Sequence, residues 1–355
     1  MKARKPITIV GGGLAGLTLG IGLRQRGIPV VIWEAGHYPR HRVCGEFISG
    51  EGQEVLSRMG LRDLVIEAGA IRAQKAVFFD RCHMGPVRPL VPPALSISRF
   101  ALDQAFAQAL QRAGGELRQN SKWQGDCGEG VVRASGRRVQ KAAGDCHWFG
   151  LKVHARKVEL AADLEMHSLP DGYVGLARLS SNEVNVCGLF RRFSHGQPAT
   201  SQPAGAGTRR SWKEVLSGPP GSALHSRLAR AEFDEASFCS VAGLDLEPQI
   251  RTEEFEIRVG DALTMIPPVT GNGMSMAFEA AEIASRHVAA YSLGELSWPE
   301  TRHRLARECR HAFARRLRWA RWLQRLMFAT SLQPSVSKLL LCSDSLWRIF
   351  FSKTR

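Results

Sequence analysis

The chain has 355 residues, 44% hydrophobic and 23% charged, which makes it long enough for two structural units and too apolar for a disordered protein. Its 48 Lys and Arg against 33 Asp and Glu give a formal net charge of +15, which predicts an anionic partner: nucleic acid, an acidic membrane surface, an acidic carrier protein or a phosphorylated substrate. The eight cysteines include no CxxC pair and no Cys and His group at metal-ligand spacing, so we expect no disulfide framework, no metal site and a reducing cytoplasm.

The chain begins with basic residues and then an apolar stretch, an order that also occurs in signal peptides. Three adjacent glycines, a continuing amphipathic pattern and the absence of a convincing cleavage site favour a folded strand and helix instead. No apolar run approaches the roughly 20 residues that span a bilayer. We therefore expect a cytoplasmic protein, with peripheral membrane contact as the alternative.

The first motif is a glycine-rich turn after a strand. The β-branched run 7–10 is typical of a strand buried in a parallel sheet, and Gly11, Gly13 and Gly16 follow it with GxGxxG spacing. In this motif the first glycine permits a tight turn, the second lets the backbone approach a pyrophosphate, and the third lets a helix pack on the strand. The spacing predicts a dinucleotide-binding unit.

The rest of this unit also follows in order. A helix is expected to begin at Leu14 and Ala15, where its N-terminus would face the phosphates. A second strand over 29–33 then leads to Glu34 and Ala35, and Glu34 is placed to accept hydrogen bonds from the ribose hydroxyls of adenosine. The unit alone does not distinguish NAD from FAD, because both contain the same adenosine diphosphate half.

A second cofactor signal lies much later in the chain, where a Gly-Asp step precedes a proline turn and a glycine-rich helix start. The carboxylate of Asp261 would accept a hydrogen bond from a ribityl hydroxyl, and the backbone N–H groups of 271–274 would face the flavin ring or a phosphate. The cofactor-binding residues predicted here are Gly260, Asp261, Pro268, Gly271, Asn272, Gly273 and Met274.

With both signals, the sequence resembles the two-site FAD enzymes that include the aromatic hydroxylases (class A flavoprotein monooxygenases) and the geranylgeranyl reductases. Members of that superfamily pair an N-terminal GxGxxG with a late Gly-Asp motif, and 267–273 resembles the loop that lines their isoalloxazine. The resemblance covers most of 1–290. It implies FAD as the cofactor, NAD(P)H as the electron donor and an α/β fold: a Rossmann-like FAD-binding domain of the GR2 type with an inserted antiparallel β-sheet substrate domain and C-terminal helices.

The loop 267–273 has an alternative interpretation. The glycines from 271 onwards also fit a second dinucleotide fingerprint, GxGxxxA. Two prolines stand where a buried strand would have to lead in, and proline is unfavourable in such a strand. We therefore expect a flavin loop and a following helix.

Residues 40–49 look like the Cys-Gly motif that the reductase branch carries near the flavin. By this resemblance Arg40 and Arg42 would reach the pyrophosphate, and Cys44 and Gly45, the predicted catalytic residues, would lie near the reacting edge of the ring. The alternative is a surface arginine turn with a buried cysteine.

Two more segments match the superfamily in part. Residues 98–103 resemble the entry to its next cofactor-domain helix, where Arg99 would contact the cofactor or only cap the structure. The hydroxylases usually have Asp-Gly where this chain has Ser135 and Gly136, and this departure argues against a typical NADPH-dependent hydroxylase. The tryptophan-rich motif of the flavin halogenases is also absent, so we expect no halogenation.

The remaining segments form the expected substrate unit and tail. Short runs of alternating hydrophobicity predict a meandering antiparallel sheet with an apolar inward face, where Lys152 and His154 are either functional polar groups or structural ones. Residues 194–222 are expected to form a loop. The predicted boundaries are 1–64, 98–146 and 251–295 for the FAD-binding domain, 65–97 and 147–250 for the substrate domain, and 296–355 for a basic C-terminal helical region.

The segment 299–330 has a helical apolar pattern and carries nine arginines against two glutamates. One interpretation is a solvated face over a helix packed on the core. The other is an anion-binding helix that engages an acidic carrier protein or an anionic membrane. Its aromatic neighbours in that case are Trp319, Trp322, Trp347, Phe350 and Phe351.

The sequence therefore predicts an FAD-dependent oxidoreductase that acts on a hydrophobic substrate, carrier-linked or isoprenoid. Its reaction would be double-bond reduction or hydroxylation through a flavin hydroperoxide. The alternative is a flavin-binding redox sensor or a membrane-associated accessory protein without turnover. The shortened basic stretch 118–146 and the missing aspartate at Ser135 support this alternative. Nucleic-acid binding is not expected, because no recognised module is present.

Overall fold

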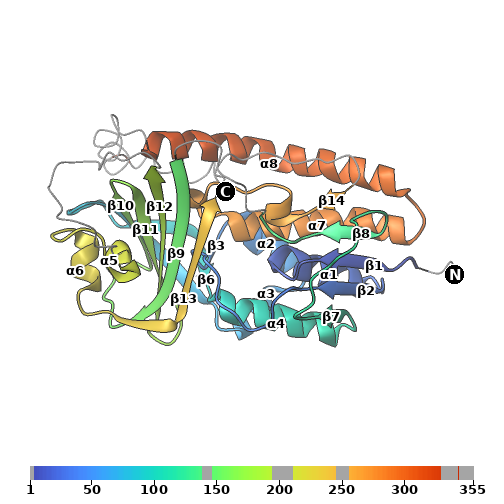
Figure 1. Ribbon diagram of the computed structural model, residues 1–355, viewed down its shortest axis with the longest axis horizontal. Coiled ribbons are helices and arrows are strands. Elements are labelled where there is room, and N and C mark those ends of the chain that lie inside the picture. The colour runs from blue at the N-terminus through green and yellow to red at the C-terminus, as the bar shows by residue number, and fades with distance from the viewer. Residues whose placement is uncertain (1–3, 138–145, 194–210, 245–255, 329–342, 344–355) are drawn as a thin grey trace.

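The computed structural model describes residues 4–137, 146–193, 211–244, 256–328 and 343. Within these ranges a parallel sheet and a larger mixed sheet lie next to each other, and the long helix α8 (Trp298–Phe328) extends along both (Figure 1). We call them sheet A and sheet B.

Sheet A has five strands in the order β14-β8-β1-β2-β7, and every pairing in it is parallel. Its central strand is the β-branched run predicted from the sequence, with Ile7 and Ile9 fully buried. The glycine-rich turn and helix α1 (Leu14–Gln25) follow directly, so the strand, turn and helix of the predicted dinucleotide unit are all present. The strands are β1 (Ile7–Val10), β2 (Val30–Trp33), β7 (Glu116–Arg118), β8 (Val131–Arg133) and β14 (Ile257–Arg258).

Sheet B has the order β13-β9-β12-β11-β10-β4-β6-β3, with β5 paired to β4. Its pairings are antiparallel, as predicted, except that β10 runs parallel to β4. These two strands come from separate insertions, so no hairpin turn sets their relative direction. The strands are β3 (Phe47–Ile48), β4 (Ile71–Asp80), β5 (His83–Met84), β6 (Arg88–Ser96), β9 (Cys146–Arg156), β10 (Leu164–Leu169), β11 (Gly172–Arg178), β12 (Val184–Phe193) and β13 (Glu232–Leu244).

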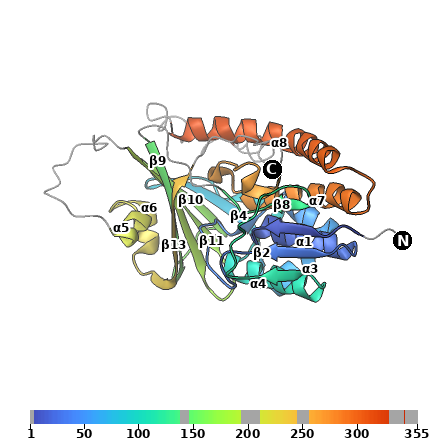
Figure 2. The same ribbon diagram turned by 45° about the vertical axis from the view of Figure 1, so that its right-hand side comes forward.

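Two short helices, α5 (Trp212–Ser217) and α6 (Ala223–Leu228), cover the face of sheet B that points away from sheet A (Figure 2). Their leucines pack with Leu151, Val153 and Val186 in one hydrophobic cluster. The prediction of a loop over 194–222 is wrong for 212–217, which form helix α5. Residues 194–210 of that prediction lie outside the described residues. The missed signal is a capping box, in which Ser211 and Glu214 satisfy each other's backbone N–H groups.

The helices next to sheet A pack around it. Helix α7 (Gly273–Ser292) lies between α1 and α8, and the predicted apolar face of α8 is buried in the same core. The short helix η2 (Pro268–Thr270) precedes α7, so no strand leads into the later glycines and the second-fingerprint interpretation is wrong. The other helices are α2 (Glu51–Arg58), α3 (Arg62–Glu67), α4 (Arg99–Arg112) and η1 (Gly260–Ala262).

The structure identifies no membrane-spanning helix among the residues that it describes. The longest helix, α8, carries nine arginines.

Candidate functional site

A cavity of about 780 Å³ lies between the carboxyl ends of the strands of sheet A and the inner face of sheet B. Its sheet A side is formed by the residues that follow β1, β2, β8 and β14, the position at which parallel α/β sheets bind their ligands. Its sheet B side includes Gly150, Tyr173, Cys187 and Val241. The volume lies within the range of about 300–1,000 Å³ that is typical of small-molecule and cofactor sites.

The cavity brings together most of the residues predicted from the two distant cofactor signals. Those that line it are Gly11, Gly13, Leu14, Ala15, Glu34, Ala35, Arg40, Arg42, Cys44, Arg99, Gly260, Asp261, Pro268, Gly273 and Met274. The predicted residues that do not line it are Gly16, Gly45, Gly271 and Asn272.

Glycine is needed at different positions of the first turn for different structural reasons. Gly11 has φ +109°, and a Cβ there would lie 2.4 Å from the carbonyl oxygen of Ala134. At Gly16 a Cβ would lie 2.0 Å from the carbonyl oxygen of Gly11, so this glycine serves the packing of helix on strand. At Gly13 no heavy atom lies within 4 Å of a Cβ, although the residue lines the cavity. The backbone at Gly13 therefore has open space in which a ligand can approach it.

The N-terminus of α1 fits a pyrophosphate. Its N-cap residue, Gly13, supplies no side-chain acceptor, and its first turn contains no acidic residue. The first N–H groups of a helix need acceptors and carry a partial positive charge. Arg40, Arg42 and Arg99 add guanidinium groups to the same cavity. The residues present thus suit the diphosphate of a dinucleotide.

Glu34 follows the end of β2, and its buried carboxylate is a hydrogen-bond acceptor. It accepts hydrogen bonds from the backbone N–H groups of Gly12 and Gly36, both at 2.8 Å, and from Arg40 at 2.6 Å. Burial raises the pKa of Glu34, but the bonds from Gly36, Arg40 and Gly12 outweigh it and hold the pKa below its usual value. The carboxylate therefore stays ionised at neutral pH, as an acceptor for ribose hydroxyls must.

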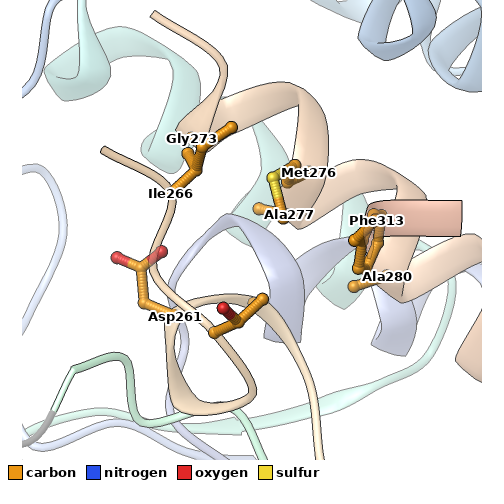
Figure 3. Close-up of a pocket in the computed structure, with 9 residues that line it drawn as sticks. Asp261, Ile266, Gly273, Met276, Ala277, Ala280 and Phe313 are labelled. Carbon is orange, nitrogen blue, oxygen red and sulfur yellow. The ribbon is translucent and has the colours of Figure 1, made fainter. Parts of the chain in front are cut away.

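Asp261 lies in η1 at the other end of the cofactor signals. Its side chain is exposed, but into the cavity, and the surrounding protein raises its pKa by desolvation. Asp261 also borders a small void of about 10 Å³ that Ala277, Ala280 and Phe313 line, and Figure 3 shows its carboxylate turned away from these apolar side chains. The polar atoms of Asp261 are thus available to a ligand in the larger cavity, such as a polyol chain.

The Cys-Gly segment is held against the inner face of sheet B. Cys44 lines the cavity, and its carbonyl oxygen accepts a hydrogen bond from the Asn185 side chain at 2.9 Å. Burial raises the pKa of the Cys44 thiol in spite of the nearby Arg99, so the thiol is protonated at neutral pH. Gly45 is exposed and outside the cavity lining.

The arginines of this region are paired with a buried acid. Arg99 binds Asp103 through two bonds of 2.7 and 2.8 Å, and Arg42 binds the same carboxylate at 3.2 Å. Arg99 thus lines the cavity and also braces α4, and its contact with the cofactor stays a prediction. Ser135 and Gly136, where the hydroxylases have Asp-Gly, also line the cavity.

Sequence reasoning missed part of the lining. Trp33 and Trp123 meet edge to face at 5.3 Å beside Glu34, and the guanidinium of Arg118 lies over the Trp33 ring at 4.5 Å. Trp33 could have been found, because it ends the strand directly before Glu34. Trp123 lies in an irregular connection without a local signal. His41, Cys187 and Cys239 were missed because their strands or loops reach the cavity only through the tertiary fold.

Lys152 and His154 lie on the cavity side of β9, as Gly150 does two residues earlier. Both are buried and belong to a polar cluster with His41 and Glu46. Among the described residues, no group of His, Cys, Asp and Glu has the arrangement of a metal site.

Comparison with known proteins connects this geometry with flavin binding. Residues 4–138 match the FAD binding domain family. A curated relative, conditioned medium factor receptor 1 of Dictyostelium discoideum, is 28% identical over 127 residues, which cover 32% of this chain and 25% of the relative. The chain thus spans about a quarter of the length of the curated relative that it matches.

Solved structures share the fold over nearly the whole chain. The flavin-dependent brominase Bmp2 has a TM-score of 0.70 at 16% identity, over 97% of this chain and 92% of that one. PqsL of Pseudomonas aeruginosa, described as a probable FAD-dependent monooxygenase, has a TM-score of 0.67 at 14% identity over 93% and 98%. The halogenase PltM in complex with phloroglucinol and FAD has a TM-score of 0.70 at 15% identity over 98% and 82%. The predicted fold class is confirmed, and the match of 4–138 to the FAD binding domain family supports FAD as the cofactor.

Proposed function

We propose that this chain, which has an FAD-binding domain and the fold of the class A flavoprotein monooxygenase superfamily, is an FAD-dependent oxidoreductase acting on a hydrophobic substrate, carrier-linked or isoprenoid. One observation carries the proposal: a single cavity joins the N-terminus of α1, Asp261 and the inner face of sheet B. The cofactor residues and a substrate-sized space are therefore continuous.

The residues that would hold FAD divide along the cavity. Gly13 and the start of α1 suit the pyrophosphate, Glu34 the adenosine ribose, and Asp261 the ribityl chain. Bound FAD supplies hydride or electron transfer, or reaction with oxygen. The chain's own residues orient the reactants, and sheet B keeps bulk water from them.

The sheet B side of the cavity suits an apolar substrate. Tyr173 and Leu189 belong to a hydrophobic cluster that also contains Met265 and Leu244, and all four line the cavity. Burial of apolar surface against such walls is the main source of affinity for a hydrophobic ligand.

Retention of FAD is the first test. Purified protein should be yellow and should release FAD, not FMN, on denaturation. A colourless protein that cannot be reconstituted with FAD would overturn the proposal.

The second test distinguishes reduction of a double bond from oxygen-dependent oxidation of the substrate. The Cys44 and Gly45 motif favours double-bond reduction, whereas the fold is shared with PqsL and the halogenases. The protein should be reduced by NADPH or NADH, the donors we propose, and then mixed anaerobically with polyisoprenoid and carrier-linked acyl substrates. Product without oxygen identifies a reductase, and product only with oxygen identifies a monooxygenase. Absence of substrate-dependent reoxidation in both conditions would instead support a redox sensor or accessory protein.

We also propose an anionic partner for α8. Arg304, Arg307, Arg315 and Arg318 are exposed at a spacing that places them on one side of the helix, and exposed Trp322 continues this row. Arginines with a tryptophan on a long straight helix suit the surface of an anionic bilayer. Arg316 is not part of this row, because it is buried in an ion pair with Glu279. Trp347, Phe350 and Phe351 lie outside the described residues.

Vesicles of phosphatidylglycerol and phosphatidylcholine would test this contact. The variant with the four exposed arginines of α8 changed to glutamine should lose sedimentation with the anionic vesicles. A control with the same change in charge replaces the exposed residues Arg62, Arg72, Lys75 and Arg230, and should retain it. Equal binding by both variants would refute the contact, and binding to an acidic carrier protein but not to vesicles would identify the other class of partner.

A further inference from the structure

Five ionisable side chains form a continuous series from the cavity wall to the turn between β11 and β12. His41 Nδ1 lies 3.0 Å from Lys152 Nζ, which lies 3.4 Å from Glu46 Oε1. Glu46 Oε2 lies 2.7 Å from His154 Nε2, and His154 Nδ1 lies 3.7 Å from Glu183 Oε2. Neighbouring members are thus close enough for direct transfer of a proton, or for transfer through one water at the Glu183 end.

Only the two ends of this series are open. The side chains of Lys152 and Glu46 are 0% exposed, and that of His154 is 4% exposed. His41 is partly exposed and lines the cavity. At the other end Glu183 is 25% exposed and pairs with Arg156, which is 65% exposed. The series therefore connects solvent with the cavity through the protein interior.

Glu46 is held in an uncommon conformation at the centre of the series. Its φ is +56°, a backbone conformation that a residue other than glycine adopts only at an energetic cost. The Arg99 N–H donates to its Oε1 at 2.9 Å, and its own carbonyl oxygen accepts from Ile97. A buried ionic cluster also contributes little to folding stability, since well-packed apolar residues can often replace such clusters without loss of stability. Strain and buried charge together point to a function of these residues.

The positions of the protons between His41 and Lys152, the two members of the series nearest the cavity, can be assigned. Burial lowers the pKa of His41 to about 4, with the charges of Lys152 and His154 acting in the same direction against Glu46 and Asp234. His41 is therefore neutral at neutral pH. An ammonium group can only donate, so Lys152 donates to Nδ1 and the proton of His41 itself lies on Nε2. Phe100 stacks on the ring at 4.6 Å.

We propose that Glu183, His154, Glu46, Lys152 and His41 form a proton relay between solvent and the cavity, with His41 as the catalytic residue that exchanges the proton with substrate and the others as carriers that position it. The inference deepens the proposed function, because it assigns the relay to the redox reaction in this cavity. Adding hydrogen to a double bond consumes one hydride from the cofactor and one proton for the second carbon. The relay supplies that proton.

The transfer conserves protons at each member. His41 gives the proton on Nε2 to the substrate carbon and receives one on Nδ1 from Lys152. Burial raises the pKa of Glu46, but the hydrogen bond from His154 and the charge of Lys152 outweigh it and hold the pKa below its usual value, so Glu46 starts as a carboxylate. Its Oε2 takes the proton of His154 Nε2, the carboxyl group turns, and this proton then passes to the uncharged Nζ of Lys152. His154 regains a proton on Nδ1 from solvent at Glu183. One proton leaves solvent, one reaches the substrate, and flips of the His41 and His154 rings restore the two starting tautomers.

The alternative is that the cluster only attaches the loop of His41 and Glu46 to β9. Two measurements on the full chain as purified separate the hypotheses. The first is the titration of His41 by NMR of histidine-labelled protein, with His41→Gln to assign its signal. His41 should titrate near pH 4 in the wild type and at a clearly higher pH in Lys152→Met, because a positive charge next to the ring has been removed. Titration at the usual histidine pKa in the wild type would overturn the relay.

The second measurement is the rate of proton uptake from weakly buffered solution, followed with an indicator dye during photoreduction of the bound FAD. Glu46→Gln keeps the volume of the side chain but cannot relay a proton, and it should slow uptake on the order of 10²-fold while FAD content stays unchanged. Glu165→Gln is the matched control, because Glu165 is also buried and pairs with a histidine, His167, at 2.9 Å on the opposite face of the sheet. It should leave the rate unchanged.

The outcomes separate the relay from the proposed function. Glu46→Gln with full FAD content and a wild-type uptake rate overturns the relay, and Lys152→Met provides the same test if Glu46→Gln does not fold. Protein without FAD contradicts the proposed function, and the NMR titration then still decides whether the coupled chain of groups exists.

Discussion

The substitution Gly13→Ala should separate cofactor binding from folding. At this residue φ is −76°, which alanine adopts without strain, and no heavy atom lies within 4 Å of the added Cβ. The protein without FAD should therefore be as stable as the wild type, or more stable by about 0.4–1 kcal/mol because the unfolded chain loses freedom. The methyl group instead occupies the space through which we expect the pyrophosphate to contact the backbone.

The loss of affinity follows from that overlap. A methyl group forced into a close contact costs about 1–3 kcal/mol, which corresponds to roughly 5-fold to 150-fold weaker FAD binding. The affinity should be measured by quenching of flavin fluorescence and the stability by urea denaturation without FAD. Gly11→Ala is the contrasting variant, because its Cβ would lie 2.4 Å from the Ala134 carbonyl oxygen and should destabilise the protein even without FAD. Gly128→Ala, at an open position outside the cavity, is the control. A wild-type dissociation constant for Gly13→Ala would show that the phosphates are bound elsewhere.

Further predictions concern the second cofactor signal and the packing around it. Asp261→Ala should weaken FAD binding about tenfold, as expected for one lost hydrogen bond to a charged group, with Asp261→Asn intermediate in the same titration. Glu256→Gln should cost roughly 1–3 kcal/mol of unfolding free energy at pH 7 in urea denaturation. Hydrogen bonds from two arginines lower the pKa of Glu256 from 4.5 to about 2, so its stabilisation is complete above pH 4.5 and the difference from the wild type should shrink as the pH falls towards 2. Arg316→Met should cost about 3–5 kcal/mol, because it leaves buried Glu279 without its partner, whereas the double variant with Glu279→Leu should recover most of the loss; equal loss in both would contradict a buried ion pair.

The cofactor unit could be predicted because its signals are local. Strand, glycine turn, helix and acid all lie between residues 7 and 34, and each has a sequence pattern set by its own backbone conformation. Asp261 was predictable for the same reason, because the Gly-Asp step and the proline turn lie next to each other. Local chemistry, however, did not indicate that Gly45 faces outwards while Cys44 faces the cavity.

The substrate side could not be predicted to the same depth, because its contacts are not local. The parallel pairing of β10 with β4 joins two insertions whose relative direction no turn determines. Lys152 and His154 could be singled out as polar residues in an apolar strand, but their partners His41 and Glu46 lie 111 and 108 positions away. Only the fold shows that these four side chains form one cluster.

Basic residues are used differently in two parts of this chain of net charge +15. Around the cavity, the arginines form ion pairs with buried acids: Asp103 binds Arg42 and Arg99, and Glu34 binds Arg40. These pairs leave guanidinium groups in place for a diphosphate without a large uncompensated field inside the protein. Along α8, the acids are instead used for internal contacts, since Glu308 binds Arg286 and His287 of α7. The exposed arginines of α8 therefore form one basic part of the surface, and an anionic partner should engage this helix independently of the cofactor.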